Sequence, residues 1–152
     1  LLCGTGLANG SKHLEGLPFT PQSRKHVVAM GASDDLPDLW QGADAFVLSS
    51  LGEGFPNVVA EAMACGLPCI VTDVGDAALI VGDTGFVVQP KDIKGLALAM
   101  SKMLQMPELE RQELGRKARE RIEDRFTQEK MAEGFHRVWC EVLTGGEYRC
   151  AD

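Results

Sequence analysis

The sequence has few aromatic residues, few basic residues and no long apolar run. Phe, Trp and Tyr make up 6% of its 152 residues, and no stretch approaches the ~18 to 20 consecutive apolar residues that cross a bilayer. Only 15 Lys and Arg stand against 22 Asp and Glu, which gives a formal net charge of -7 at pH 7. Because a protein that neutralises a phosphate backbone carries the opposite sign, we expect no nucleic-acid partner.

The chain is long enough for one globular domain. A hydrophobic content of 45% suffices for a buried core. Leu1–Gly4 contain no initiating Met, no basic region and no cleavage site of small residues, so we interpret them as a strand rather than a signal peptide. We expect one domain over residues 1–143, truncated at its N-terminal edge, and a frayed tail over 144–152.

The five cysteines are odd in number and scattered, which is typical of a reducing compartment. We therefore expect a cytoplasmic protein. The spacing Cys65-x-x-x-Cys69 is compatible with a metal ligand pair, but no second Cys or His pair lies near it in the sequence. We expect no metal site, and we interpret both cysteines as small buried apolar residues.

Short apolar runs alternate with helical patterns along the chain. Continuous apolar runs suit strands that are covered on both faces, as in a parallel sheet. Strands that alternate with helices predict a Rossmann-like, doubly wound α/β fold. The expected strands are 1–3, 26–30, 45–48, 69–72 and 85–88, and the expected helices are 35–41, 56–65, 93–105, 108–125 and one that begins after Thr127.

The last three predicted helices differ in their apolar faces. The helix after the N-cap Asp92 is expected to bury one face, made of Ile93, Leu96, Met100 and Met103 or Leu104. The helix over 108–125 alternates acids and bases and should present a solvated face. The helix after Thr127 carries an apolar stripe that indicates core packing, with docking against another domain as the alternative. The stripe consists of Met131, Phe135, Val138, Trp139 and Val142.

Residues 49–68 combine a strand end, a glycine-bounded loop with a carboxylate, and the start of a helix. In open α/β sheets, ligands bind outside the carboxyl ends of the strands. A helix N-terminus offers free N–H groups and a partial positive charge, which suit a phosphate. The backbone amides from Gly54 to Val58 are therefore candidates for binding a diphosphate.

Glu53 and Glu61 are two acids in this segment, where a carboxylate would repel phosphate. An ionised carboxylate accepts several O–H donors at once. Glu61 could thus hold the two hydroxyls of a ribose, and Glu53 could hold hydroxyls of a sugar beyond the diphosphate. By spacing alone, Glu53 could equally be an exposed loop acid, and Glu61 an acid favoured by the helix dipole.

The stretch from Glu53 to Pro68 resembles the Glu-x7-Glu signature of family 4 retaining glycosyltransferases with the GT-B fold. The similarity continues through residues 43–50, 71–75 and 82–88, and it covers roughly residues 1–143. It implies a Rossmann-like, donor-binding domain that forms the C-terminal half of a GT-B glycosyltransferase.

The resemblance also implies roles for site residues. Glu53, at the catalytic position, would contact the transferred sugar, and Glu61 would hold the ribose. The nucleobase would meet Gly31 and Ala32. The donor sugar and diphosphate would be lined by Gly54, Phe55, Pro56, Asn57 and Val58. The turn that contains Gly4 and Gly6 would lie beside the nucleotide, although a tight turn after a strand is the simpler interpretation of such glycines.

By this resemblance, the complete enzyme transfers a sugar from a UDP-, GDP- or ADP-sugar to an acceptor hydroxyl with retention, without a metal cofactor, in polysaccharide or glycan biosynthesis. A glycan or lipid-linked acceptor would bind an N-terminal domain outside this chain, so the chain alone should be inactive. Membrane contact would be peripheral, on the inner face of the cytoplasmic membrane. The alternatives are a GT-B-like sugar-nucleotide epimerase or phosphorylase and a non-catalytic nucleotide-sugar binding module.

Overall fold

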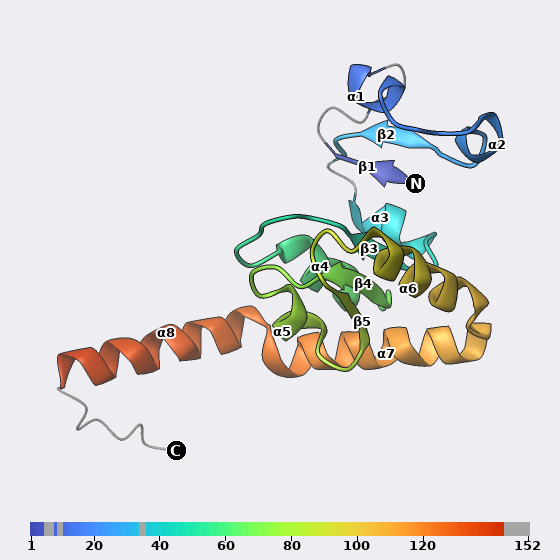
Figure 1. Ribbon diagram of the computed structural model, residues 1–152. Helices are drawn as coiled ribbons and strands as arrows, with labels where there is room; N and C mark the ends of the chain where they lie inside the picture. The colour runs from blue at the N-terminus through green and yellow to red at the C-terminus, as the bar shows by residue number, and fades with distance from the viewer. Residues whose placement is uncertain (5–7, 9–10, 34–35, 145–152) are drawn as a thin grey trace. The chain divides into compact units, whose positions relative to one another are not determined.

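The computed structural model describes residues 1–4, 8, 11–33 and 36–144. The chain has two compact parts, Leu1–Leu39 and the residues from Trp40 onwards, which we describe separately. Helix α3, Leu36–Gln41, contains the point where the first part ends. Every described strand pairs with its neighbours in parallel, as the sequence predicts (Figure 1).

The part Leu1–Leu39 is built on two short strands and two short helices. Strand β1, Leu2–Cys3, pairs with β2, Ala29–Gly31. An isolated antiparallel bridge joins Ala8 to Met30. The helices are α1, Lys12–Glu15, and α2, Pro21–Arg24, and neither was predicted.

Strand β2 begins three residues later than the predicted strand 26–30. The amide N–H of His26 donates to the Ser23 carbonyl at 3.1 Å, and that of Val27 donates to the Arg24 carbonyl at 3.2 Å. These local bonds continue the turn of α2, so the first residues of the apolar run are not extended. The Thr20 hydroxyl, which accepts the Ser23 amide, marks the start of that turn.

From Trp40 onwards, three strands form a parallel sheet in the order β3-β4-β5. Their bounds, Phe46–Leu48, Cys69–Thr72 and Gly85–Val88, agree with the predictions to within one residue. The helices of this part are α4 (Asn57–Ala64), α5 (Ala77–Val81), α6 (Ile93–Gln105), α7 (Glu108–Arg125) and α8 (Gln128–Leu143). Of these only α5 was not predicted, because five apolar residues are too few to show a helical period.

Helices cover both faces of the β3-β4-β5 sheet. Ile70 on the central strand packs with Ala99 and Met103 of α6. The neighbouring Cys69 points to the opposite face and is also fully buried. On that face lies Val81 of α5, which α4 contacts in turn. A parallel sheet buried on two sides is the doubly wound arrangement that the alternating pattern predicts.

Helix α4 ends where the sequence indicates. Gly66 has a φ of +80°, a left-handed conformation that glycine adopts without a Cβ clash. The N–H of Gly66 donates to the Met63 carbonyl at 2.9 Å, and the N–H of Leu67 donates to the Ala62 carbonyl at 3.1 Å. This pair of bonds is the Schellman motif, which satisfies the last carbonyls of the helix.

The predicted apolar face of α6 is correct only in part. Leu96 is half-buried and Met103 is buried, but Ile93, Met100 and Leu104 are exposed. The side of α6 that is buried contains Ala99 instead, because only the residues that pack against Ile70 of β4 are covered. A small residue there allows the helix to approach the sheet closely.

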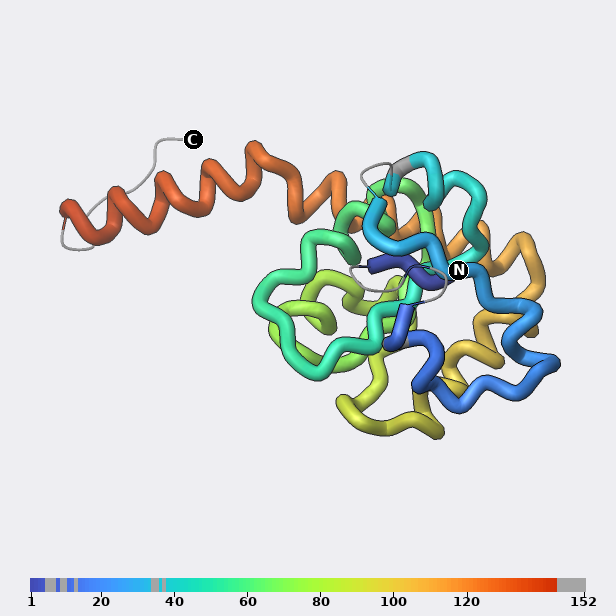
Figure 2. The backbone as a smooth tube through the Cα atoms, turned by 90° about the horizontal axis from the view of Figure 1, so that it is seen from above, coloured from blue at the N-terminus to red at the C-terminus, as the bar shows by residue number. Residues whose placement is uncertain are grey.

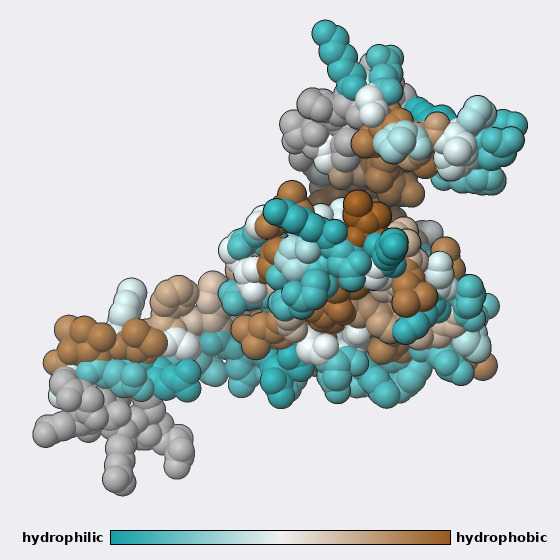
Figure 3. All heavy atoms as spheres, viewed as in Figure 1, coloured by the Kyte–Doolittle hydropathy of each residue, from teal (hydrophilic) through white to brown (hydrophobic). Residues whose placement is uncertain are grey.

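The prediction that the apolar stripe of α8 packs in the core is wrong. None of the residues of α8 is buried, and the five stripe residues are at least half exposed. Figure 2 shows α8 following directly on the end of α7, and Figure 3 shows apolar atoms along one side of α8 and polar atoms along the other. The Thr127 hydroxyl accepts the Lys130 amide, so the predicted N-cap is confirmed. The predicted tail beyond residue 144 lies outside the described residues.

The buried Cys69 thiol should react far more slowly than Cys65. Burial raises the pKa of Cys69 to about 12, while Cys65 is exposed. At pH 8, Cys69 then holds a thiolate fraction lower by a factor on the order of 10³ than an unperturbed thiol. Alkylation of the native protein followed by peptide mass mapping should label Cys65 and leave Cys69 unmodified until urea is added. Equal native labelling of both would contradict the buried placement.

Candidate functional site

The loops that follow the three parallel strands lie at one edge of the β3-β4-β5 sheet. Parallel strands end at the same edge, so the residues after Leu48, Thr72 and Val88 come together there. Hydrogen bonds join the strand ends and these loops to one another. The Thr72 hydroxyl donates to the Ser50 carbonyl at 2.6 Å, and the Gln89 side-chain amide donates to the Asp73 carboxylate at 3.4 Å. This edge is where ligands bind in open α/β sheets.

Glu53 is exposed in the loop between β3 and α4. The Ser50 hydroxyl donates to Glu53 Oε1 at 2.6 Å. No Lys, Arg or His in the described ranges forms an ion pair with this carboxylate. Glu53 Oε2 has no hydrogen-bond partner among the described residues, so it is available as an acceptor for a hydroxyl group.

The backbone around Glu53 is held by the loop after β4. The Asp76 amide donates to the Gly54 carbonyl at 2.9 Å. Gly75 has a φ of +52°, and a Cβ at this position would overlap the carbonyl oxygen of Gly54. Only glycine permits so close an approach in this conformation. The two loops are thus fitted to each other at the peptide that follows Glu53.

The start of α4 presents free backbone donors beside Glu53. Pro56 is the N-cap, and Asn57 is the first helical residue. Within the part of the chain that the structure describes, the amides of Gly54, Phe55, Asn57 and Val58 donate to no protein acceptor. The positive end of the helix dipole adds to these N–H groups, so the segment can bind an anion.

Glu61 lies in the second turn of α4 and is exposed. Its side chain makes no hydrogen bond or ion pair among the residues that the structure describes. The unpaired amides and both exposed carboxylates belong to one loop and the helix that follows it. The sequence predicted this combination; the loop lies at the edge of the sheet where ligands bind in open α/β folds, and the binding roles of these residues stay a prediction.

The other predicted nucleotide-binding residues lie in the part Leu1–Leu39. The Gly4 amide donates to the Gly31 carbonyl at 2.8 Å, so these two predicted positions are neighbours. Ala32, directly after β2, is exposed. Gly6 lies outside the described residues.

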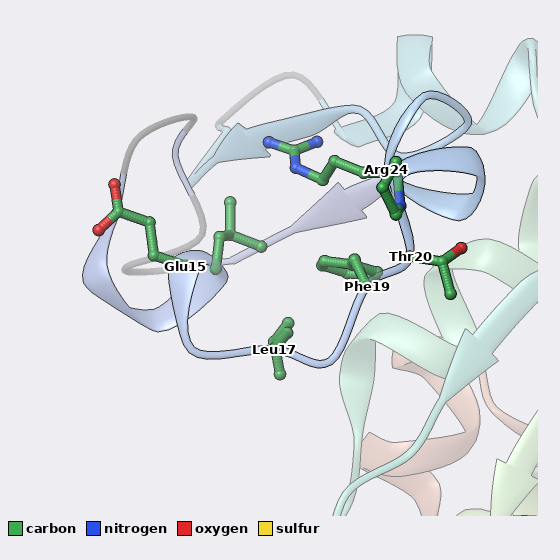
Figure 4. A pocket seen from close by; sticks show the side chains of 7 residues that line it. Glu15, Leu17, Phe19, Thr20 and Arg24 are labelled. Carbon is green, nitrogen blue, oxygen red and sulfur yellow. The ribbon is translucent and has the colours of Figure 1, made fainter.

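A pocket of about 270 Å³ lies between α1 and α2 (Figure 4). Its lining includes Glu15, Leu17, Phe19, Thr20 and Arg24. The Arg24 guanidinium lies 6.0 Å from the Phe19 ring centroid and donates to the Val27 carbonyl at 3.0 Å. These contacts belong to local packing, and the pocket contains none of the predicted site residues.

A metal site is not formed by the residues that the structure describes: no three His, Cys, Asp or Glu side chains among them gather closely enough. Cys69 is buried as predicted, but Cys65 is exposed, so the interpretation of both as buried apolar residues is correct only for Cys69. No helix in the described ranges combines the length and apolar character needed to span a bilayer.

Residues 1–106 match the family described as Glycosyl transferases group 1. The chain belongs to this family. It is 35% identical over 119 residues to N-acetyl-alpha-D-glucosaminyl L-malate synthase of Bacillus anthracis, covering 77% of this chain and 31% of that protein. It is 30% identical over 131 residues to the capsular polysaccharide biosynthesis glycosyltransferase CapM of Staphylococcus aureus, covering 85% and 34%.

Among solved structures, this group 1 chain is similar to sucrose-phosphate synthase from Thermosynechococcus elongatus. The TM-score is 0.70 at 30% identity, over 80% of this chain and 31% of that one. With the family match, this confirms the predicted fold class, a Rossmann-like C-terminal half of a GT-B glycosyltransferase. The chain spans about a third of the length of these relatives.

Sequence reasoning did not assign roles to Ser50, Thr72 and Asp76. Ser50 stands three residues before Glu53, close enough in the sequence for its hydroxyl to reach the carboxylate. That spacing could have indicated the Ser50 contact. The contacts of Thr72 and Asp76 with the preceding loop join residues 22 apart in the sequence, and no local pattern announces them.

Proposed function

We propose that this chain binds the nucleoside-diphosphate sugar used by a retaining glycosyltransferase. The observation that carries the proposal is the segment after β3, in which an exposed carboxylate with a free oxygen precedes a helix start with four unpaired amides. The amides from Gly54 to Val58 bind the diphosphate, Glu53 accepts hydroxyls of the transferred sugar, and Glu61 accepts the two ribose hydroxyls. By the family resemblance alone, the nucleobase contact is assigned to Gly31 and Ala32, and the nucleotide contact to Gly4 and Gly6.

The proposed reaction is substitution at the anomeric carbon with retention. The bond from this carbon to the β-phosphate oxygen breaks, and the acceptor oxygen forms its bond on the same face. The acceptor hydroxyl proton passes to the leaving phosphate, so the products are a glycoside and a nucleoside diphosphate. Charge grows on the diphosphate as the bond breaks, and preorganised amides at the start of α4 stabilise it. We propose no metal cofactor for this step.

The proposed acceptor is a glycan or a lipid-linked glycan. It would bind a further domain, since this chain spans about a third of its relatives' length. Support for polysaccharide or glycan biosynthesis comes from relatives whose names describe capsular polysaccharide biosynthesis and galactosyl transfer. We propose a cytoplasmic enzyme whose membrane contact is peripheral, and we expect the 152-residue chain alone to bind the donor without turnover.

A panel of UDP-glucose, GDP-mannose and ADP-glucose tests the proposal directly. Saturation-transfer NMR on the folded full-length protein should show transfer to the sugar and ribose protons of at least one of them. Binding should require the diphosphate, so the free sugar should give no signal. Absence of binding by every member of a wider nucleotide-sugar panel would overturn the proposed function.

Removing the Glu61 carboxylate should weaken nucleotide binding. Each hydrogen bond to a charged group contributes about 1.5–3 kcal/mol, so Glu61→Ala should raise the Kd for the nucleoside diphosphate by about 10- to 100-fold. Calorimetry with the ribonucleotide and its 2′-deoxy analogue separates this role from a general effect. The wild type should prefer the ribonucleotide, and Glu61→Ala should lose most of that preference. An unchanged preference would contradict the assignment.

A further inference from the structure

Two hydroxyl groups connect the buried end of β4 to the Glu53 carboxylate. Thr72, the last residue of β4, is 4% exposed. Its hydroxyl donates to the Ser50 carbonyl at 2.6 Å, and the Ser50 hydroxyl donates to Glu53 Oε1 at 2.6 Å. Ser50 is thus fixed from the core side through its backbone, and it holds an exposed carboxylate through its side chain.

Glu53 has little else to hold its side chain. It lies in a loop without regular structure, and its described side-chain contacts include no ion pair. A glutamate side chain loses much rotamer freedom when it is immobilised, so a free Glu53 would sample several orientations. A short bond from a hydroxyl to a carboxylate is among the stronger hydrogen bonds, so Ser50 can hold Glu53 in one rotamer before a ligand arrives.

The backbone on the other side of Glu53 is held separately. The Asp76 amide fixes the Gly54 carbonyl, and Gly75 packs against the same peptide. With the main chain held by the loop after β4, the remaining freedom of Glu53 is its side-chain rotation. Ser50 is the described residue that restricts this rotation.

We propose that Ser50 is a positioning residue for Glu53. It occupies Oε1 and leaves Oε2 directed to the ligand, so that Glu53 meets the donor sugar in a single orientation. Thr72 supports Ser50 from the sheet. The inference rests on the proposed function, because it assigns Ser50 a role in the sugar-binding half of the same site. It implies a donor sugar with a hydroxyl that can reach Oε2.

Ser50→Ala in the full-length protein tests this role. The turnover readout is release of nucleoside diphosphate from the donor identified in the panel. Misplacing a reacting group by about 1 Å can cost on the order of 10²-fold, and we expect kcat to fall by about 10- to 100-fold with a smaller change in KM. Ser50→Thr, which keeps the hydroxyl, should restore most of kcat. The matched control is Ser49→Ala, which removes the neighbouring exposed hydroxyl and should leave kcat unchanged.

A double-mutant cycle shows whether Ser50 acts through Glu53. In a Glu53→Ala background, which removes the acceptor of the Ser50 hydroxyl, Ser50→Ala should reduce the remaining kcat by far less than in the wild type. Nucleoside diphosphate affinity should be the same in all variants. Ser50→Cys keeps the size of the side chain but has only a weak hydrogen-bond donor, so its kcat should lie between those of the wild type and Ser50→Ala. It replaces Ser50→Ala in the cycle if Ser50→Ala lowers the thermal midpoint of unfolding.

The outcomes separate this inference from the proposed function. A wild-type protein that binds and turns over no nucleotide sugar would overturn the proposed function itself. A wild type that turns the donor over, with a kcat for Ser50→Ala equal to that of Ser49→Ala, would overturn the role of Ser50 alone. Equal losses from Ser50→Ala in both backgrounds would show that Ser50 acts independently of Glu53, which also overturns the inference.

Discussion

Glu53→Ala in the full-length protein should abolish most sugar turnover while nucleoside diphosphate binding persists. Glu53 faces the position proposed for the sugar and makes its described contact with Ser50, so its removal leaves the amides at the start of α4 in place. Loss of one preorganised group at a reacting centre costs on the order of 10²–10³ in kcat. Release of nucleoside diphosphate measures kcat, and calorimetry measures the affinity for the nucleoside diphosphate.

The matched control is Glu110→Ala, which removes an exposed acid on α7, away from the loops after β3 and β4. Glu110→Ala should change neither kcat nor the affinity for the nucleoside diphosphate. If Glu53→Ala turns over the donor as fast as this control, Glu53 has no catalytic role. If it also loses nucleotide binding, the carboxylate supports the fold of the loop rather than contacting the sugar.

Gly115→Ala should destabilise the protein, although alanine is normally favoured over glycine inside a helix. Gly115 lies in α7 and is buried against α4. A Cβ at Gly115 would overlap the Gly66 carbonyl oxygen, a backbone atom in the Schellman turn that ends α4. The helices must separate to admit the methyl group, and overpacking of this kind costs about 1–3 kcal/mol of unfolding free energy.

Gly134→Ala provides the control for the propensity of the residue itself. Gly134 lies inside α8, and a Cβ there would meet no heavy atom within 4 Å among its surroundings. This substitution should raise the unfolding free energy by about 0.5–1 kcal/mol. Urea denaturation followed by circular dichroism measures both changes. If Gly115→Ala and Gly134→Ala changed the unfolding free energy in the same direction, the close approach of α7 to the end of α4 would be contradicted.

The sequence predicts those parts of the fold whose cause is local. The residues from Cys69 to Thr72 form a strand that is buried on both faces. A continuous apolar run of this kind indicates such a strand without any knowledge of the strands beside it. Asp92 caps α6 by accepting the Gly95 amide at 2.8 Å, as the residue type indicates. The stretch from the end of β3 to Glu61 likewise contains its own loop and helix start.

Features that join distant residues could not be predicted in this way. Arg121 of α7 donates to the carbonyls of Leu79 and Ile80 at 2.8 Å, and so fixes the end of the short helix α5. In the sequence it is one more cation in an alternating charged helix. The apolar stripe of α8 shows the converse, because a helical period reveals that an apolar face exists but not what lies against it.

The hydrogen bond from the Asp76 amide to the Gly54 carbonyl, with Gly75 packed on the same peptide, has a consequence for exchanging parts between relatives. The segments 49–56 and 73–76 are in direct contact through this bond and this close approach. A chimera that imports the first from a relative with a different donor should keep its shape only if the second comes from the same parent. The two loops therefore have to be exchanged together if the shape of this edge of the sheet is to be kept.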